Sequence, residues 1–259
     1  MILVIILAID TTSEWGGAGI FRDVECVAAI PHQGPADYSV SLFRDVDGLL
    51  EQAGVSLGDI DLFAASNGPG AFTGIRVGLA AVQGWSHALE KPWRGISIFE
   101  AMVEASCTVM RYALPILDAR RGELYAGLFE RAVSGPALRF ERSGNAALLK
   151  PEQVTPFLEN SLGAGCGPKS EGSECCTVIA REGDVAAIAI QELIPPSCGW
   201  KAIAPFLVPA ISRLALRATK EGRPVLPEET TACYIRRTDA ELHLSERASR
   251  ASSIKPEAG

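Results

Sequence analysis

Asp10, Thr11, Thr12 and Ser13 follow the first apolar run of the chain and are the first residues whose types could support chemistry. A carboxylate beside small hydroxyl side chains and backbone N–H groups can hold phosphate oxygens and a metal-bound water. The same hydroxyls can instead cap the end of a strand, and this is the role we favour for Thr11 and Thr12. The residues of this turn alone leave both interpretations open.

A glycine-rich loop within Ser66–Gly78 is the second candidate, with Gly68, Pro69, Gly70 and Thr73 between an apolar strand and an apolar helix. Such a loop at a helix N-terminus can bind an anion, and the Thr73 hydroxyl is placed to cap the helix. The loop lacks the lysine of a P-loop. A turn that simply requires glycine is the alternative, and we favour this architectural role.

Other catalytic patterns are absent from the sequence. His32, His87 and His243 form no H-x-x-x-H or H-E-x-x-H pair, and there is no G-x-S-x-G nucleophile elbow. The seven cysteines show no C-x-x-C spacing, so we expect reduced thiols rather than a disulfide framework or a zinc site. Neither catalysis nor metal binding is predicted.

The bulk composition is that of a globular protein, with 259 residues, 47% hydrophobic and 21% charged. The net charge of −7 argues against a chain that binds a polyanion by itself. The apolar run that ends at Ile9 is far shorter than the ~20 residues of a membrane span. We therefore expect a buried strand here, and a cytoplasmic protein without membrane contact.

Apolar periodicity predicts alternating strands and helices in the first half of the chain. Strands are predicted at Ile2–Asp10, Ala18–Arg22, Val24–Ile30, Ile60–Ser66 and Arg94–Ile96, and helices at Tyr38–Gln52, Thr73–Leu89 and Phe99–Met110. Later helices are predicted at Pro151–Asn160, Asp184–Leu193 and Pro205–Glu221, with a loop at 164–168 and a disordered tail from Ser245.

The helix Thr73–Leu89 is apolar around nearly all of its circumference, so both of its sides must be covered. A stripe of small residues on one side would let another helix approach closely. We expect a partner to pack against this helix and Tyr38–Gln52; an internal helix layer is the alternative. The candidate interface consists of Tyr38, Leu42, Asp45, Val46, Gly74, Val77, Gly78, Ala81 and Trp85.

An internal duplication is indicated by two segments that align without a gap. Ala8–Phe21 matches Ile116–Phe129, with Asp10 opposite Asp118. The second copy has Arg120 and Arg121 where the first has hydroxyl side chains. Two bulky cations there do not suit a symmetrical phosphate clamp, so we interpret Asp10–Ser13 as a vestigial phosphate turn.

Four segments together resemble the TsaB (YeaZ) family at matching positions and in matching order. They are Ile6–Ser13, Asn67–Arg76, Asp118–Tyr125 and Pro227–Arg236. The resemblance implies an α/β fold of the ASKHA (actin-like, ribonuclease H-like) class with two related lobes. We expect the lobes at 1–112 and 113–244, followed by the tail at 245–259.

The resemblance also implies a function. Family members are non-catalytic subunits that dimerise with the transferase TsaD, which makes N6-threonylcarbamoyladenosine at position 37 of tRNAs that read codons beginning with A. The ATPase TsaE docks on this pair, and tRNA is reached only through the complex. No cofactor is implied for the chain itself, although an adenine nucleotide could bind at the complex interface. Tyr38 stands where many members have histidine, so the partner surface is expected to differ there.

Two other functions remain open from the residues. One is an active ASKHA enzyme, either a small-molecule kinase or a TsaD-like transferase or M22-type peptidase. The other is a homodimer formed through the same helices. An active enzyme would need a second intact phosphate turn or a histidine metal pair, and the sequence has neither. Arg236 and Arg237 could face tRNA, but we expect ordinary solvated cations.

Overall fold

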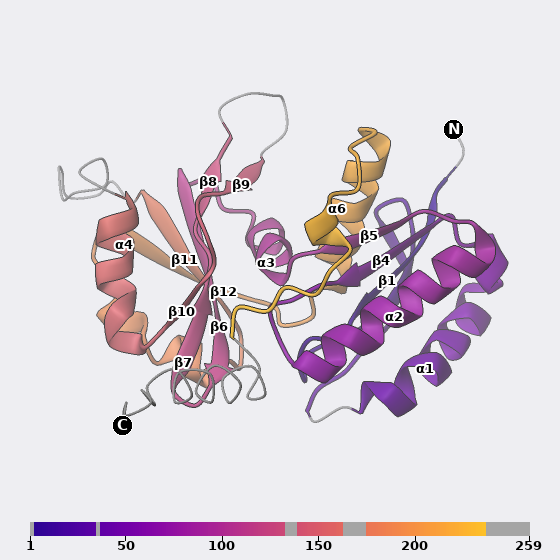
Figure 1. The fold of residues 1–259 in the computed structure, drawn as a ribbon, viewed down its shortest axis with the longest axis horizontal. Coiled ribbons are helices and arrows are strands. Elements are labelled where there is room, and N and C mark those ends of the chain that lie inside the picture. Colours follow the sequence, from indigo (N-terminus) through magenta and orange to yellow (C-terminus); the bar gives the residue numbers. More distant parts are fainter. Residues whose placement is uncertain (1–2, 35–36, 133–138, 163–174, 237–259) are drawn as a thin grey trace, which may run out of the picture.

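The computed structural model describes residues 3–34, 37–132, 139–162 and 175–236, which form two mixed β-sheets with helices between and outside them (Figure 1). The strands of the first sheet are β1 (Ile5–Asp10), β2 (Gly17–Arg22), β3 (Glu25–Pro31), β4 (Leu62–Ser66) and β5 (Trp93–Ile96). Their order is β3-β2-β1-β4-β5. The first three are antiparallel neighbours, whereas β4 and β5 run parallel to β1.

The second sheet repeats this plan. Its strands are β6 (Tyr112–Arg120), β7 (Glu123–Ala126), β8 (Phe129–Arg131), β9 (Phe140–Arg142), β10 (Ala147–Leu149), β11 (Cys176–Arg181) and β12 (Cys198–Ile203). The order β10-β7-β6-β11-β12 has the same mixture of antiparallel and parallel pairs, with β8 and β9 added beside β6. The two sheets thus have the same topology, as the ungapped match of Ala8–Phe21 with Ile116–Phe129 predicts.

Helices form three layers around the sheets. They are α1 (Tyr38–Ala53), α2 (Phe72–Leu89), α3 (Ile98–Ser106), α4 (Val154–Leu162), α5 (Val185–Ile188) and α6 (Val208–Lys220). Short 3₁₀ turns are η1 (Leu57–Asp59), η2 (Pro151–Gln153), η4 (Gln191–Leu193) and η5 (Pro227–Glu229). Helices α1 and α2 cover the outer face of the first sheet, α3 and α6 lie between the sheets, and α4 lies on the far side of the second sheet (Figure 1).

Local signals explain where α1 begins and ends. Asp37 caps its N-terminus by accepting hydrogen bonds from the Ser39 backbone N–H and hydroxyl. Gly54 ends it in the left-handed conformation, with φ of 66°. One face of α1 then buries Leu42, Val46 and Leu49 against the first sheet. This fixes which side of the α1–α2 layer faces outward.

Most predicted elements are confirmed within a few residues, including the later helices at Pro151–Asn160 and Pro205–Glu221, which correspond to η2 with α4 and to α6. The third helix ends at Ser106 rather than Met110, because Cys107 is left-handed. The single helix predicted at Asp184–Leu193 is instead α5 followed by the turn η4. Strands β9 to β12 were not predicted. The loop at 164–168 and the tail at 245–259 lie outside the described residues.

Helix α6 crosses back to the first sheet. It packs against β1, β2, β4 and β5 as well as against α3. A division of the chain at residue 112 therefore separates this helix from the sheet that it covers, and the lobe boundaries remain a prediction.

Two further expectations concern the cysteines and the membrane. Cys175 is disulfide-bonded, so the expectation that all seven thiols are reduced is wrong. The five cysteines outside a disulfide are Cys26, Cys107, Cys176, Cys198 and Cys233. Within the described ranges, no helix combines the length and the apolar character needed to cross a bilayer.

Candidate functional site

Asp10 ends β1 at the floor of the turn between β1 and β2, and its side chain is fully buried. Its Oδ1 atom accepts hydrogen bonds from the Thr12 backbone N–H (2.9 Å), the Thr12 hydroxyl (2.6 Å) and the Ser66 hydroxyl (2.7 Å). A carboxylate oxygen with three donors is fully occupied. This half of the carboxylate therefore organises the turn itself.

The second oxygen of Asp10 faces an arginine from the other sheet. Arg181, the last residue of β11, places Nη2 at 3.5 Å from Asp10 Oδ2 and donates from Nη1 to the Ser13 hydroxyl at 2.6 Å. Arg181 is only 2% exposed, and its Nε has no hydrogen-bond partner. Burial lowers the pKa of the Arg181 guanidinium, and the negative charge of Asp10 opposes this shift. A fixed cation thus lies beside Asp10.

The remaining hydroxyls of the turn are also used internally. Thr11 donates to the Gly74 carbonyl at 2.7 Å, and the Tyr38 hydroxyl donates to the Ser13 carbonyl at 2.9 Å. Burial raises the pKa of Tyr38, and the nearby Asp10 charge adds to this effect. Tyr38 therefore remains a neutral donor at physiological pH. The hydrogen-bonding groups of these side chains are therefore used within the turn and its immediate neighbours.

A cavity of about 640 Å³ opens in front of this turn and is lined by residues from both halves of the chain. Arg120 lines its far wall, and both Arg120 and the following Arg121 adopt left-handed backbone angles, with φ of 63° and 59°. The Arg120 guanidinium lies 3.3 Å from Asp118 and 3.7 Å from Glu14. The Arg120 cation of the second turn is therefore paired with one carboxylate from each of the two turns. No group of three His, Cys, Asp or Glu among the described residues could hold a metal ion.

The glycine loop is packed between the turn and the C-terminal segment. The Ala71 backbone N–H donates to the Thr12 carbonyl at 2.7 Å, and a Cβ on Gly70 would lie 2.5 Å from that oxygen. Gly68 has φ of 106°, which favours glycine. The prediction that Thr73 caps α2 is wrong: α2 begins at Phe72, and its N-cap is Ala71, which makes no side-chain bond. The glycines allow close backbone packing.

The residues of the candidate partner interface lie in the α1–α2 layer, but most of them face inward. Seven are buried, namely Tyr38, Leu42, Asp45, Val46, Gly74, Gly78 and Ala81, whereas Val77 and Trp85 are half-buried. Asp45 is paired with His32 at 2.8 Å. The small-residue stripe of α2 therefore faces the turn at Thr11.

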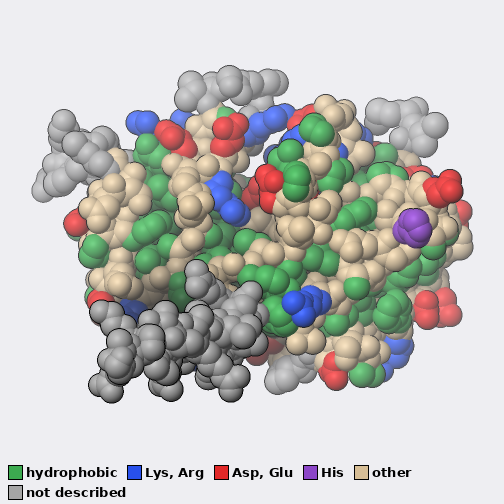
Figure 2. All heavy atoms as spheres, in the orientation of Figure 1, with side chains coloured by type: hydrophobic (Ala, Val, Ile, Leu, Met, Phe, Trp, Pro, Cys, Tyr) green, Lys and Arg blue, Asp and Glu red, His purple; other side chains and the backbone are tan. Residues whose placement is uncertain are grey.

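An apolar surface nevertheless lies on the outside of the same two helices. Val40 is 71% and Phe43 53% exposed on α1, and the Phe43 ring contacts the Trp85 ring of α2 edge-on. Ala80 and Gly84 are exposed one and two turns beyond Arg76 on α2. Figure 2 shows hydrophobic side chains with few charged ones in the region of α2. We call Val40, Phe43, Ala80, Gly84 and Trp85 the outer α1–α2 face.

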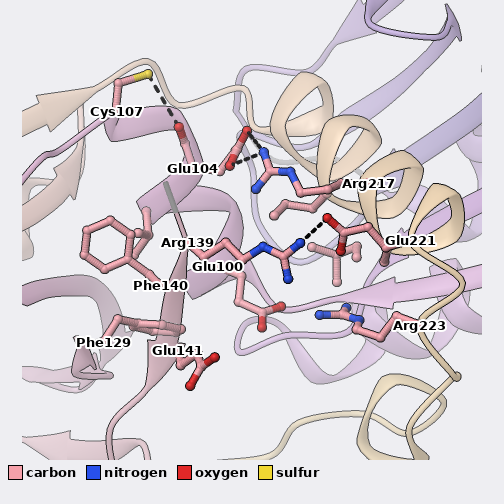
Figure 3. Close-up of a pocket in the computed structure, with 14 residues that line it drawn as sticks. Glu100, Glu104, Cys107, Phe129, Arg139, Phe140, Glu141, Arg217, Glu221 and Arg223 are labelled. Carbon is pink, nitrogen blue, oxygen red and sulfur yellow. Dashed lines mark hydrogen bonds and ion pairs between the residues drawn. The ribbon is translucent and has the colours of Figure 1, made fainter. Parts of the chain in front are cut away.

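A second cavity, of about 400 Å³, lies between α3, α6 and the β8–β9 strands (Figure 3). Its charged side chains largely pair with one another. Glu104 accepts two bonds from Arg217, at 2.8 and 2.9 Å, and Arg139 is paired with Glu221 across the cavity. The Glu104 pair connects α3 to α6, and the Arg139 pair connects the start of β9 to the end of α6.

Glu100 is the exception in this cavity. Its carboxylate accepts a bond from its own helix start, the Ser97 backbone N–H at 3.3 Å, and points into the cavity (Figure 3). Burial raises the pKa of Glu100 above its ordinary value. A carboxyl with a raised folded pKa favours the folded state less once it ionises. Stability is therefore lost as the pH rises through the folded pKa.

Glu100→Gln is expected to raise the thermal midpoint at pH 8 by about 2–4 °C and to leave it unchanged near pH 4. The amide keeps an acceptor for the Ser97 N–H but carries no charge to desolvate. Thermal unfolding at the two pH values measures this. Glu141→Gln, on the exposed part of the same cavity, is the control and should not change either midpoint. Equal midpoints for Glu100→Gln and wild type at pH 8 would contradict the assignment.

Sequence reasoning missed the residues that come from the second half of the chain. Arg181 was not expected, because it ends a strand that was not predicted. Arg236 is not a solvated cation: it donates to the Ala119 carbonyl at 2.9 Å and pairs with Glu123. Arg237 lies outside the described residues. Buried charges are almost always paired with an opposite charge. The buried Asp10 carboxylate therefore implies a cationic partner, but the sequence does not say which residue it is.

Comparison with known proteins adds to this geometry. The family model for TsaD, tRNA N6-adenosine threonylcarbamoyltransferase, matches residues 29–138. The tRNA threonylcarbamoyladenosine biosynthesis protein TsaB of Escherichia coli is 28% identical over 201 residues, which is 74% of this chain and 85% of that protein. TsaB of Bacillus subtilis is 29% identical over 48% of this chain and 55% of its own length.

Solved structures are similar in fold. YeaZ from Pseudomonas aeruginosa has a TM-score of 0.63 and 24% identity, and the match covers 89% of this chain and 99% of that chain. A second Pseudomonas aeruginosa structure, described as similar to peptidase YeaZ, has a TM-score of 0.66 over 90% of this chain.

The duplicated sheets and the two facing turns define an α/β protein with the ASKHA (actin-like) fold. In this chain, Arg181 is paired with Asp10 at the end of β1. Within that fold class, the chain is similar to the TsaB (YeaZ) proteins, with the match to the Escherichia coli protein covering most of both chains.

Proposed function

We propose that this chain is the non-catalytic partner subunit of a TsaD-type transferase. In this role it takes part in the formation of N6-threonylcarbamoyladenosine at position 37 of tRNAs that read codons beginning with A. The observation that carries the proposal is the outer α1–α2 face, where Val40 and Phe43 are largely exposed on an otherwise well-packed layer. Exposed apolar surface of this kind is typical of a protein–protein interface.

The geometry of the turn argues against the alternative of an active ASKHA enzyme. A metal-bound water or a phosphate would have to compete with Arg181 for Asp10 and with internal hydrogen bonds for the hydroxyls of Thr11, Thr12 and Ser13. The free energy lost by breaking these buried contacts is larger than the free energy gained by binding a weak ligand. The transferase chemistry is therefore assigned to the partner.

The other members of the proposed assembly follow from the family. A TsaE-type ATPase docks on the pair, an adenine nucleotide binds at the complex interface, and tRNA is contacted through the complex. The net charge of −7 supports this indirect role toward tRNA. A homodimer through the outer α1–α2 face is the competing use of the same surface.

Gly84→Arg tests the proposal, because it places a long cation in the middle of the outer α1–α2 face. A Cβ on Gly84 would meet no atom within 4 Å, so the chain should fold normally. We expect affinity for the purified TsaD-type subunit of the same organism to fall about 100-fold, measured by isothermal titration calorimetry, since a buried unpaired charge is costly at an interface.

Asn160→Arg is the matched control. It adds the same cation to an exposed position of α4, at the opposite end of the molecule from α2 (Figure 1). This variant should bind the TsaD-type subunit as the wild type does. Unchanged affinity of Gly84→Arg would sink the proposed interface. ATP turnover by the purified chain alone, without a partner, would favour the active-enzyme alternative.

A further inference from the structure

An arginine that packs over one aromatic ring and bonds to a second lies at the rim of the outer α1–α2 face. The Arg76 guanidinium carbon lies 3.7 Å from the centre of the Phe72 ring and 5.7 Å from that of Tyr234. The two ring centres are 4.8 Å apart, and Arg76 Nε donates to the Tyr234 hydroxyl at 2.9 Å. All three side chains are exposed, Phe72 by 36% and Tyr234 by 40%. We call these three residues the Arg76 cluster.

The Arg76 cluster is built from two distant parts of the chain. Tyr234 comes from the segment after α6, and this segment is anchored on either side of it. The Cys233 N–H donates to the Asn67 carbonyl at 2.7 Å, and Arg236 donates to the Ala119 carbonyl at 2.9 Å. The tyrosine is therefore fixed in place, and it fixes the orientation of the guanidinium. Such preorganisation lowers the entropy lost on binding.

The charge of Arg76 is left without a carboxylate. The exposed arginines 111, 120 and 139 each pair with a Glu or Asp, whereas in the described part of the chain Arg76 contacts only its two aromatic neighbours. Its Nη1 and Nη2 atoms remain as two parallel donors. This fork matches the two oxygens of a carboxylate in a bidentate pair.

We propose that the Arg76 cluster is an anchor for an acidic side chain, Asp or Glu, of the protein that docks on the outer α1–α2 face. This inference rests on the proposed function and names a specificity contact within it. Arg76 is followed by Ala80 and Gly84 at helical spacing, so the cluster continues the apolar stripe. An apolar centre with an arginine and aromatic residues beside it is the usual composition of a binding hot spot.

A phosphate of tRNA is the other oxyanion that Arg76 could bind. Nucleic-acid affinity requires several clustered cations, because each phosphate contact contributes little by itself. Beside Arg76, the outer surface of α2 carries no further Lys or Arg, and α1 carries Asp47 and Glu51 along with Arg44. The isolated fork beside an apolar face thus favours a protein carboxylate.

Substitutions at the cluster test the inference by calorimetric titration with the purified TsaD-type subunit. Arg76→Ala should weaken binding about 30-fold, and Arg76→Lys about 10-fold, because lysine retains the charge but not the fork. Tyr234→Phe should weaken it about threefold through the lost hydroxyl. The effect of Arg76→Ala should shrink between 0.1 and 0.5 M salt.

Arg111→Ala is the matched control, since Arg111 also lies against a tyrosine ring but is already paired with Glu130. It should leave affinity within twofold of wild type. Wild-type affinity of Arg76→Ala, together with the expected loss of affinity in Gly84→Arg, would overturn the anchor and leave the proposed function intact. Loss of tRNA affinity by the assembled complex without loss of subunit affinity would assign Arg76 to phosphate and also overturn it. If neither variant affected subunit binding, the proposed function itself would fail.

Discussion

Arg181→Ala is expected to lower the free energy of unfolding by about 3–5 kcal/mol, because it leaves the fully buried Asp10 carboxylate without its cation. The Ser13 hydroxyl would lose its 2.6 Å donor at the same time. Arg181 comes from β11 and Asp10 from β1, so the loss falls on a contact between the two sheets. Urea denaturation at pH 7 measures it.

The reason for this effect can be separated from simple loss of packing. The double variant Asp10→Asn, Arg181→Met removes both charges and keeps much of the volume, so it should recover most of the lost stability. Arg111→Ala removes an exposed arginine that pairs with Glu130 and should cost at most about 1 kcal/mol. An Arg181→Ala variant within about 1 kcal/mol of wild type would show that Asp10 is not held as a buried ion by this contact.

The fold was accessible from the sequence where a single segment contains its own signal. The strand at Ile5–Asp10 and the helix at Tyr38–Ala53 show clear apolar periodicity, and the gapless match around Asp10 and Asp118 anticipated the repeated topology. Strands β9 and β10 have three residues each, which is too short for a period to be recognised. Strand β11 is buried along its whole length, and its uniform burial produces no alternation.

The site was less accessible, because its chemistry is decided between segments far apart in the chain. Asp10 and the hydroxyls of the turn suggest phosphate binding by type, and nothing in their neighbourhood in the sequence names Arg181 as the group that faces them. Arginine at a strand end is usually solvated. The chemical role of the turn thus depends on the contact between Asp10 and Arg181, which lie 171 residues apart in the sequence.

The orientation of α2 raises the same difficulty. Periodicity assigns Gly74 and Gly78 to one stripe and Ile75 and Leu79 to another, but both stripes are apolar, so the pattern does not say which one faces a partner. The structure shows that both are buried and that a third stripe, with Ala80 and Gly84, is outside. Gly74 and Gly78 therefore allow close internal packing, whereas Gly84 lies on the outer surface of α2.

Gly78→Leu is expected to destabilise the chain by about 3 kcal/mol or more, rather than to block a partner as the small-residue stripe alone would suggest. A Cβ at this position would lie 2.4 Å from the Thr11 hydroxyl oxygen, and Thr11 is fixed by its 2.7 Å bond to the Gly74 carbonyl. The larger side chain must displace either the helix or the turn that contains Asp10. Denaturant unfolding at pH 7 measures the loss.

Gly84→Leu, the same substitution on the outer stripe of the same helix, should give the opposite result. Its Cβ meets no atom within 4 Å, and removing a glycine from an exposed helix interior stabilises by up to about 1 kcal/mol. The pair of variants thus separates internal packing from partner contact. The opposite outcome would be a Gly78→Leu protein that unfolds at the wild-type denaturant concentration but no longer binds the TsaD-type subunit. It would show that the small-residue stripe contacts the partner.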